Sequence, residues 1–302
     1  MPREGLGDKS SFSSFHPLVS FAYFAAVLGL GMFSMHPLIL ALTVATGAAY
    51  TFLLGGGKAL RDALLVSLPL LVFTVLLNPL FNHRGATVLF YLNDNAVTLE
   101  AILYGLAAAS MLVGVILWFG CFGRIVTADK FIYLFGRVLP SISLVLSMCL
   151  RYIPMLRQRY RQIAEGQRCM GRVYGARQPI RRLRQVAREV SILIAWSLES
   201  SIETSDSMEA RGYGLPGRTS FHIFRFTRRD GWALAVIAVL SAVATAGLVG
   251  GITEVYYYPS VVCTHRLTDI LPVAAAHLAL LALPIFIDIE GERRWRKWNF
   301  EM

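Results

Sequence analysis

Long apolar segments limit what this chain can fold into more than any other feature of its sequence. Six of them are about 20 residues long, which is the length that a helix needs to cross the hydrocarbon core of a bilayer. Their bounds are 16–34, 37–54, 62–81, 97–119, 232–251 and 268–288. The chain is also only 16% charged, against about 25% in soluble domains. The sequence therefore predicts an all-α polytopic membrane protein with about six transmembrane helices, and it argues against a soluble globular enzyme.

The excess of basic residues is concentrated in one segment. Residues 151–229 hold 16 of the 29 Lys and Arg residues, all of them arginine, but only 6 of the 19 acidic residues. Such a segment is typical of a cytoplasmic loop beside anionic lipid headgroups. It is equally typical of a docking surface on which arginine forks bind carboxylates. The two interpretations are compatible, and both make this segment a candidate for interaction.

The positions of the remaining basic residues predict the orientation of the chain. If the N-terminus lies in the cytoplasm, all but two of the 29 basic residues fall on the cytoplasmic side. The two exceptions are Arg84 and Arg266, which fall in outer loops. This asymmetry follows the positive-inside rule. We therefore expect a multi-pass protein of the cell membrane with both termini in the cytoplasm.

Residues 131–150 form an apolar stretch that does not fit this topology. The stretch is nearly long enough to span a membrane, but it contains Arg137 and Pro140, and its crossing would move the basic segment to the outside. We expect a helix that lies at the cytoplasmic surface or enters the membrane only partly. The expected organisation is N-terminal transmembrane helices at 1–130, a basic cytoplasmic or membrane-surface domain at 131–229, and a C-terminal helix pair with a basic tail at 230–302.

Two long helices are expected within the basic domain. Apolar residues recur at helical spacing from Ile153 to Met170, and a second helix is expected from about Ile180 to Arg211. Its apolar contacts are expected from Val186, Val190, Leu193 and Ile194. The first helix carries an arginine stripe and the second an acidic stripe, namely Arg157, Arg161, Arg168 and Arg172 against Glu199, Glu203 and Asp206. These stripes are either solvated or paired with each other across the two helices.

The sharpest local motif follows the second of these helices. Gly212 suits the left-handed residue after a helix end, Arg211 is a cation where the helix dipole favours one, and Pro216 prevents continuation. A helix cap alone explains these three residues. It does not explain why the helix ends with an arginine between two small residues, which leave room for a partner surface to approach.

This motif resembles a known family. The string SMEARGYG at 207–214 is similar to the second Ala-Arg-Gly coupling motif of energy-coupling factor (ECF) transporter T components, the EcfT or CbiQ-like membrane scaffolds of ECF-type ABC importers. The strings TLEAILYG at 98–105 and LSMCLRYIPML at 146–156 extend the resemblance. It therefore covers most of residues 98–217. The resemblance implies two coupling helices in the basic domain.

The resemblance also implies which residues contact partners. Ala210, Arg211 and Gly212 would form the second motif, which docks onto one of two cytoplasmic ATPases. The first motif would fall at Cys169, Met170 and Gly171, where this sequence has methionine in place of the expected arginine. Either Arg168 or Arg172 then takes the electrostatic role, or the first contact is mainly apolar.

The function that the resemblance implies is that of a non-catalytic scaffold in a prokaryotic plasma membrane. It would transmit the movement of two ABC-type ATPases to a substrate-binding S component that imports a vitamin or a metal ion. No cofactor or metal is expected in this chain, because ATP would be bound by the partner subunits. The string Gly55-Gly56-Gly57-Lys58-Ala59 lacks the upstream glycine and the hydroxyl residue of a P-loop, and we expect no enzyme activity.

Two other functions remain open from the residues alone. A self-contained secondary transporter would need broken helices and buried ionisable groups around a midspan site, for which His277 and Asn78 are the nearest candidates. We expect His277 to be a neutral, hydrogen-bonded side chain, and Glu100 to lie near water at the outer end of its span. A membrane-anchored protein that grips an anionic partner with its arginines is the other alternative, although no nucleic-acid partner is expected.

Overall fold

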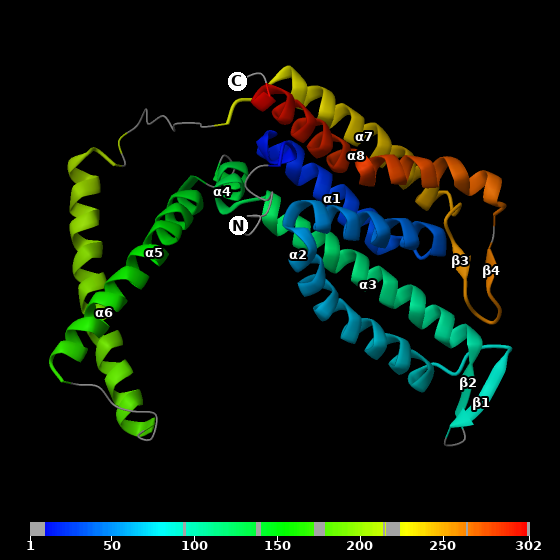
Figure 1. The fold of residues 1–302 in the computed structure, drawn as a ribbon, viewed down its shortest axis with the longest axis horizontal. Coiled ribbons are helices and arrows are strands. Elements are labelled where there is room, and N and C mark those ends of the chain that lie inside the picture. Colours follow the sequence, from blue (N-terminus) through cyan, green and yellow to red (C-terminus); the bar gives the residue numbers. More distant parts are fainter. Residues whose placement is uncertain are drawn as a thin grey trace. The chain divides into compact units, whose positions relative to one another are not determined.

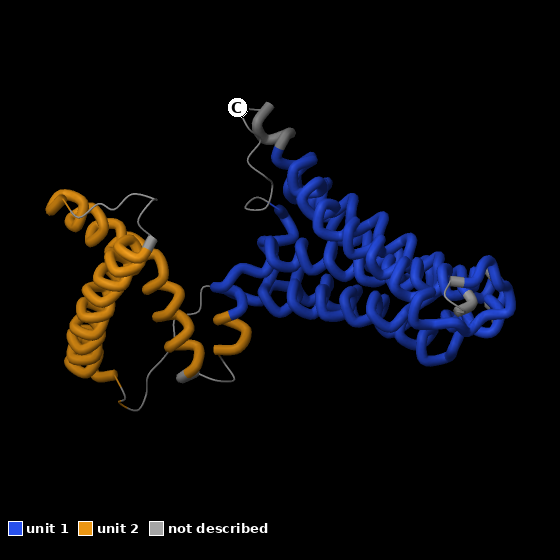
Figure 2. Tube along the Cα trace, turned by 90° about the horizontal axis from the view of Figure 1, so that it is seen from below, with its two compact units in different colours: residues 1–131, 224–302 blue, residues 132–223 orange. Residues whose placement is uncertain are grey.

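The structure, a computed structural model, describes every residue except 1–9, 93–94, 137–139, 172–178, 214, 216–223, 264 and 301–302. The chain divides into two compact units (Figure 2). One unit combines residues 1–131 with 224–302, and the other consists of residues 132–223. Residues of the predicted N-terminal and C-terminal regions thus form one helical bundle, and the second unit lies within the basic domain predicted at 131–229.

The first unit is a bundle of long apolar helices (Figure 1). They are α1 (Pro17–Phe33), α2 (Pro37–Phe81), α3 (Leu99–Ile125), α7 (Arg228–Val249) and α8 (Leu267–Phe300). Four of them, α2, α3, α7 and α8, contain segments long and apolar enough to cross a membrane, and α1 is a shorter apolar helix. All six predicted apolar segments fall on these five helices. The prediction of an all-α polytopic membrane protein is confirmed.

The second and third predicted segments are the two arms of α2. Gly56 interrupts the helical conformation with φ 66° and ψ −170°, a backbone region that is readily accessible only to glycine. The chain reverses there, and both arms lie on the same side of the bend (Figure 1). The triplet Gly55-Gly56-Gly57 therefore lies between the two apolar segments predicted at 37–54 and 62–81. The bend also brings Gly55 against Arg124 at the end of α3.

The helices α1 and α2 begin with the same local motif. In both cases a His-Pro-Leu sequence starts the helix, with proline at the first helical position and histidine before it. The Nδ1 atoms of His16 and His36 accept hydrogen bonds from the amides of Leu18 and Leu38, each at 3.3 Å. Proline has no N–H to satisfy at this position and its fixed φ suits the first turn. The short segment 34–36 thus ends one span and begins the next.

An aromatic cluster holds the bundle together. Trp118 of α3 is 1% exposed and packs near Tyr23 and Phe24 of α1 and Tyr50 of α2. Its indole Nε1 donates a hydrogen bond of 3.1 Å to the carbonyl of Thr43. The buried core continues through α7 and α8, so that all five long helices contribute to it.

Two of the polar side chains within the bundle are paired with neighbouring helices. His277 of α8 is buried, and its Nε2 lies 3.1 Å from the hydroxyl of Thr43 in α2. Asn78 donates from Nδ2 to the carbonyl of Ala101. Both residues thus have structural partners, as expected for His277. Glu100, in contrast, is buried and accepts hydrogen bonds from the amide and hydroxyl of Thr87, so the expectation that water reaches it is wrong.

Two short β-hairpins at one end of the bundle were not predicted. One pairs β1 (Val88–Leu92) with β2 (Asn95–Thr98), and the other pairs β3 (Val255–Tyr256) with β4 (Val262–Cys263). Both lie at the end of the bundle opposite the bend of α2 (Figure 1). The first residues of α1 and α7, and the last residues of α3 and α8, lie at the same end as the bend. Which end faces the cytoplasm stays a prediction of the charge distribution.

The second unit is built from two long helices. They are α5 (Pro140–Cys169) and α6 (Pro179–Ala210), and the shorter α4 (Ala128–Gly136) precedes them at the unit boundary. The single helix predicted over 131–150 is therefore wrong, because α4 ends at Gly136 and the remaining residues from Pro140 belong to α5. Proline lacks the N–H of a helix interior and favours the first turn, which explains why a new helix begins at this position.

Candidate coupling-helix site

The two helices of the second unit cross each other (Figure 1), and polar contacts hold the crossing. The hydroxyl of Tyr152 in α5 lies 3.2 Å from that of Thr204 in α6. The Arg159 guanidinium lies over the ring of Trp196, at 4.9 Å from its centroid. Because Tyr152 meets Thr204 whereas Tyr160, later in α5, meets Glu189, earlier in α6, the helices run antiparallel. The residues of this seam are polar and aromatic, so the spacing of aliphatic residues alone does not reveal it.

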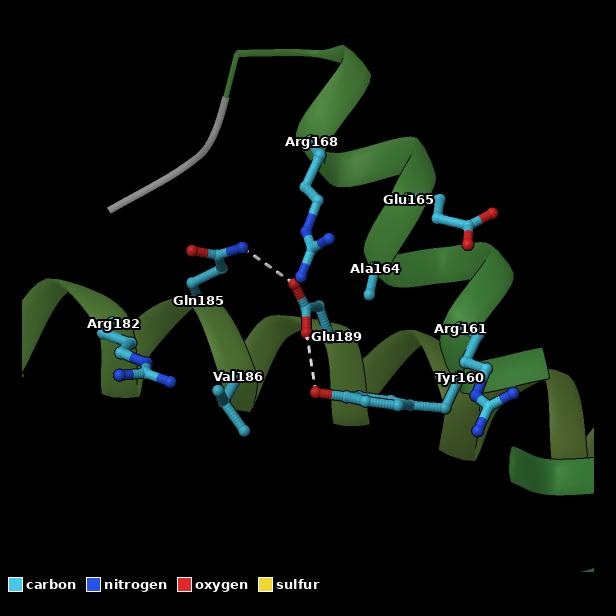
Figure 3. A pocket seen from close by; sticks show the side chains of 9 residues that line it. All are labelled: Tyr160, Arg161, Ala164, Glu165, Arg168, Arg182, Gln185, Val186 and Glu189. Atoms are coloured by element: carbon cyan, nitrogen blue, oxygen red, sulfur yellow. Dashed lines mark hydrogen bonds between the residues drawn. The ribbon is translucent and has the colours of Figure 1, made fainter. Parts of the chain in front are cut away.

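A shallow pocket of about 330 Å³ lies where the helices diverge toward the end of α5 (Figure 3). At its centre the buried Glu189 accepts hydrogen bonds from the Tyr160 hydroxyl at 3.0 Å and from Gln185 Nε2 at 2.9 Å. The hydrogen bond to this carboxylate raises the pKa of Tyr160. Arg168 points from α5 toward the same carboxylate (Figure 3). Glu189 therefore joins the two helices through polar contacts.

Of the two alternatives for the arginine and acidic stripes, solvation and mutual pairing, the described residues support solvation. Among the described members of the two stripes, no ion pair within 4.0 Å is found, and the ion pairs Arg61–Asp62 and Arg294–Glu290 lie outside the second unit. Glu199, Glu203 and Asp206 are exposed on α6. The two helices are instead held together by the hydroxyl, amide and aromatic contacts described above, and the stripes remain accessible to solvent or to a partner.

The end of α6 carries the predicted second motif in a defined backbone conformation. Gly212 has φ 77°, the Gly212 amide bonds to the Glu209 carbonyl at 2.9 Å, and the Tyr213 amide bonds to the Met208 carbonyl at 3.0 Å. These two bonds and the positive φ define a Schellman cap. Arg211 is the last residue before the glycine and is exposed. The cap uses main-chain atoms only, so the Arg211 side chain is not required to hold the helix end.

The end of α5 has a matching conformation. Gly171 has φ 72°, and its amide bonds to the carbonyl of Arg168 at 2.9 Å. Met170 is the last residue before this glycine and is 58% exposed. Met170 thus occupies at the end of α5 the position that Arg211 occupies at the end of α6. Cys169 and Ala210, the last residues of the two helices, are equivalent in the same way and both are exposed.

Arg168 and Arg172 were the two candidates to replace the arginine that the first motif lacks, and the structure describes only Arg168. Arg168 is exposed, but it lies two residues before Met170 and points back toward the helix crossing (Figure 3). It therefore does not reproduce the position of Arg211. Arg172 lies outside the described residues. Of the predicted site residues that the structure describes, the two triplets 169–171 and 210–212 are brought into equivalent local conformations.

The apolar residues of α6 that the sequence predicts to make contacts are mostly exposed in the structure. Leu193 is half-buried, but Val186, Val190 and Ile194, which were expected to make contacts, are exposed. Val186 lines the pocket with residues of α5, whereas Val190 and Ile194 belong to a larger set of exposed aliphatic residues on another side of the helix. This outer face of α6 comprises Ile180, Leu183, Val190, Ile194, Leu198 and Ile202. The spacing of these residues was visible in the sequence, but periodicity does not say which face meets the neighbouring helix.

No family model matches this chain. The chain is 34% identical over 101 residues to the energy-coupling factor transporter transmembrane protein EcfT of Lactobacillus helveticus, and 36% identical over 110 residues to EcfT 1 of Listeria monocytogenes. These alignments cover 33% and 36% of this chain and 36% and 40% of the two relatives. The EcfT of Leuconostoc gelidum is 24% identical over 182 residues, which are 56% of this chain and 66% of that protein.

The aligned part spans less than half of the length of the first two relatives. Eight curated relatives carry the same protein name, with identities from 24% to 36%. This agreement bears out the resemblance that the motifs at 98–105, 146–156 and 207–214 indicate. Over about a third of its length, the chain is similar to the EcfT family of energy-coupling factor transporter transmembrane proteins.

Proposed function

We propose that this chain is the T component of an ECF-type importer, a membrane scaffold that couples two cytoplasmic ATPases to a substrate-binding S component. The observation that carries the proposal is the equivalence of the two helix ends. Each of the two long helices ends at a glycine with positive φ. The residue before each glycine is exposed, and its side chain takes no part in capping the helix. Two copies of one docking element suit two related partner subunits.

The two docking elements differ in chemistry. Arg211 presents a guanidinium that binds carboxylates or carbonyl oxygens through paired hydrogen bonds. Met170 presents an unbranched, polarizable side chain that adapts to an irregular apolar surface. We infer that the contact at the end of α6 is electrostatic and that the contact at the end of α5 is apolar. The two ATPase surfaces would then differ in the same way.

The outer face of α6 offers a surface to which a third partner would bind. Its six aliphatic residues are exposed in the isolated chain, and a contiguous apolar surface of this kind marks an interaction site. In the proposed assembly this face would contact the membrane-embedded S component, while the polar crossing with α5 remains intact. ATP would be bound and hydrolysed by the partner subunits, and a vitamin or a metal ion would be the cargo of the S component.

Co-purification tests this proposal. The tagged chain would be co-expressed with the candidate ATPase pair from the same genome, purified in mild detergent, and its subunit composition measured by native mass spectrometry. We expect two ATPase subunits per chain. A monodisperse chain that retains no ATPase would contradict the proposal and would revive the secondary-transporter hypothesis.

A further inference from the structure

Residues 10–16, which precede α1, contact three other parts of the bundle; we call them the N-terminal strap. On one side the strap lies against α8. The Phe12 amide donates a hydrogen bond of 2.8 Å to Asp288 Oδ1, and Asp288 also accepts from the Tyr50 hydroxyl at 3.1 Å. A Cβ added at Gly291 would lie 2.6 Å from the Ser11 Cβ, so that glycine is the residue that lets the strap lie this close to α8.

On a second side the strap holds Lys130, which lies one residue before the boundary of the first unit. Lys130 is 5% exposed, and its Nζ donates to the Ser13 carbonyl at 2.7 Å and to the Ile125 carbonyl at 3.0 Å. Ile125 is the last residue of α3, whose terminal carbonyls need such a donor. Burial lowers the pKa of Lys130. One ammonium therefore joins the strap to the point at which the chain leaves the bundle.

On a third side the strap holds the segment through which the chain returns to the bundle. The His16 amide donates to Asp230 Oδ1 at 3.1 Å, and Arg229 donates to the Ser14 hydroxyl at 3.0 Å. The Arg229 guanidinium also lies over the ring of Phe15, at 3.9 Å from its centroid. Asp230 is buried and forms the capping box that starts α7. The strap is thus fixed to the start of α7 by both polar and aromatic contacts.

We propose that the N-terminal strap clamps the outgoing connection at Lys130 and the returning connection at Arg229 and Asp230 to each other and to α8, with Lys130 as its positioning residue. The chain leaves the bundle after residue 131 and returns at residue 224, so every covalent path between the two units passes these contacts. Movement of the second unit would therefore reach α3, α7 and α8 together rather than one helix at a time. Its use in transport rests on the proposed function, but the clamp itself does not.

Hydrogen exchange at the returning connection tests the clamp. In purified full-length chain, we expect Lys130→Met to speed amide exchange in residues 224–231 about tenfold, because the strap that holds them loses its anchor on the other side. Lys130 has no described contact with those residues. Lys58→Met, at an exposed lysine of α2, is the matched control and should leave the exchange unchanged. Faster exchange confined to residues 125–136 would overturn the proposal.

A second variant displaces the strap without removing a charge. Gly291→Leu should push Ser11 off α8 and speed exchange at both 125–131 and 224–231, whereas Gly123→Leu, at a glycine with open space beside it, should not. Unchanged exchange in Gly291→Leu would contradict the clamp even if Lys130→Met does not fold. ATPase retention, measured on the same variants, separates the two proposals. If the wild-type chain retains no ATPase, the proposed function fails while the exchange result still decides the clamp.

Discussion

The variant Arg211→Glu is expected to lose essentially all ATPase retention while the chain remains folded. The side chain is exposed at the end of α6 and the cap is made by backbone atoms, so the substitution removes no internal contact. A carboxylate there is unfavourable to the helix dipole and repels the acceptor groups that a guanidinium binds. In the proposed assembly two docking contacts act together, so that loss of one also removes the avidity of the other, and retention should fall by at least about 100-fold.

A matched charge reversal controls this experiment. Arg188 is also an exposed arginine of α6, but it lies far from the helix end, so Arg188→Glu should keep the ATPases bound. Size-exclusion profiles of both variants report whether they are folded. Normal retention by a folded Arg211→Glu variant would remove Arg211 from the docking site, and equal loss in Arg188→Glu would indicate a diffuse electrostatic effect rather than a site.

The largest effect on stability is expected for Trp118→Ala. This side chain is 1% exposed, packs against rings from α1 and α2, and donates to the Thr43 carbonyl. Truncation of a buried tryptophan removes about 3–5 kcal/mol of unfolding free energy. For a chain of this size, each kcal/mol of lost unfolding free energy lowers the midpoint of thermal unfolding by a few degrees. The midpoint measured in detergent should therefore fall by roughly 10 °C.

The control for this variant is another tryptophan of the bundle. Trp232 lies in α7 and is 76% exposed, so Trp232→Ala should leave the midpoint within about 2 °C of the wild-type value. A similar decrease in both variants would mean that the aromatic cluster around Trp118 does not hold α1, α2 and α3 together.

Features with local causes were predictable from the sequence. The six apolar segments, the bend at Gly56 and the helix end at Gly212 each follow from a few consecutive residues: an apolar run, a glycine triplet, or a glycine placed after a helix. The start of α6 at Pro179 follows in the same way. These signals concern backbone conformation, which the local sequence determines strongly.

Features that depend on distant partners were not predictable. The strap is too short to show a pattern, and its backbone is ordered by Asp230 and Asp288, more than 200 residues away. The exposed side of α6 was assigned incorrectly because its seam with α5 is built from tyrosine, threonine and glutamate contacts rather than from leucines. A short hairpin such as β3–β4 has too few residues to leave a pattern.

Site-specific photo-cross-linking tests most directly whether each coupling helix ends at an ATPase. A cross-linking residue would replace Met170 at the end of α5, Tyr213 just beyond the end of α6, or Leu183 on the outer face of α6, which is 71% exposed. We expect positions 170 and 213 each to capture an ATPase subunit from the co-expressed complex, and position 183 to capture none. Capture at neither helix end, or equal capture at position 183, would contradict this expectation.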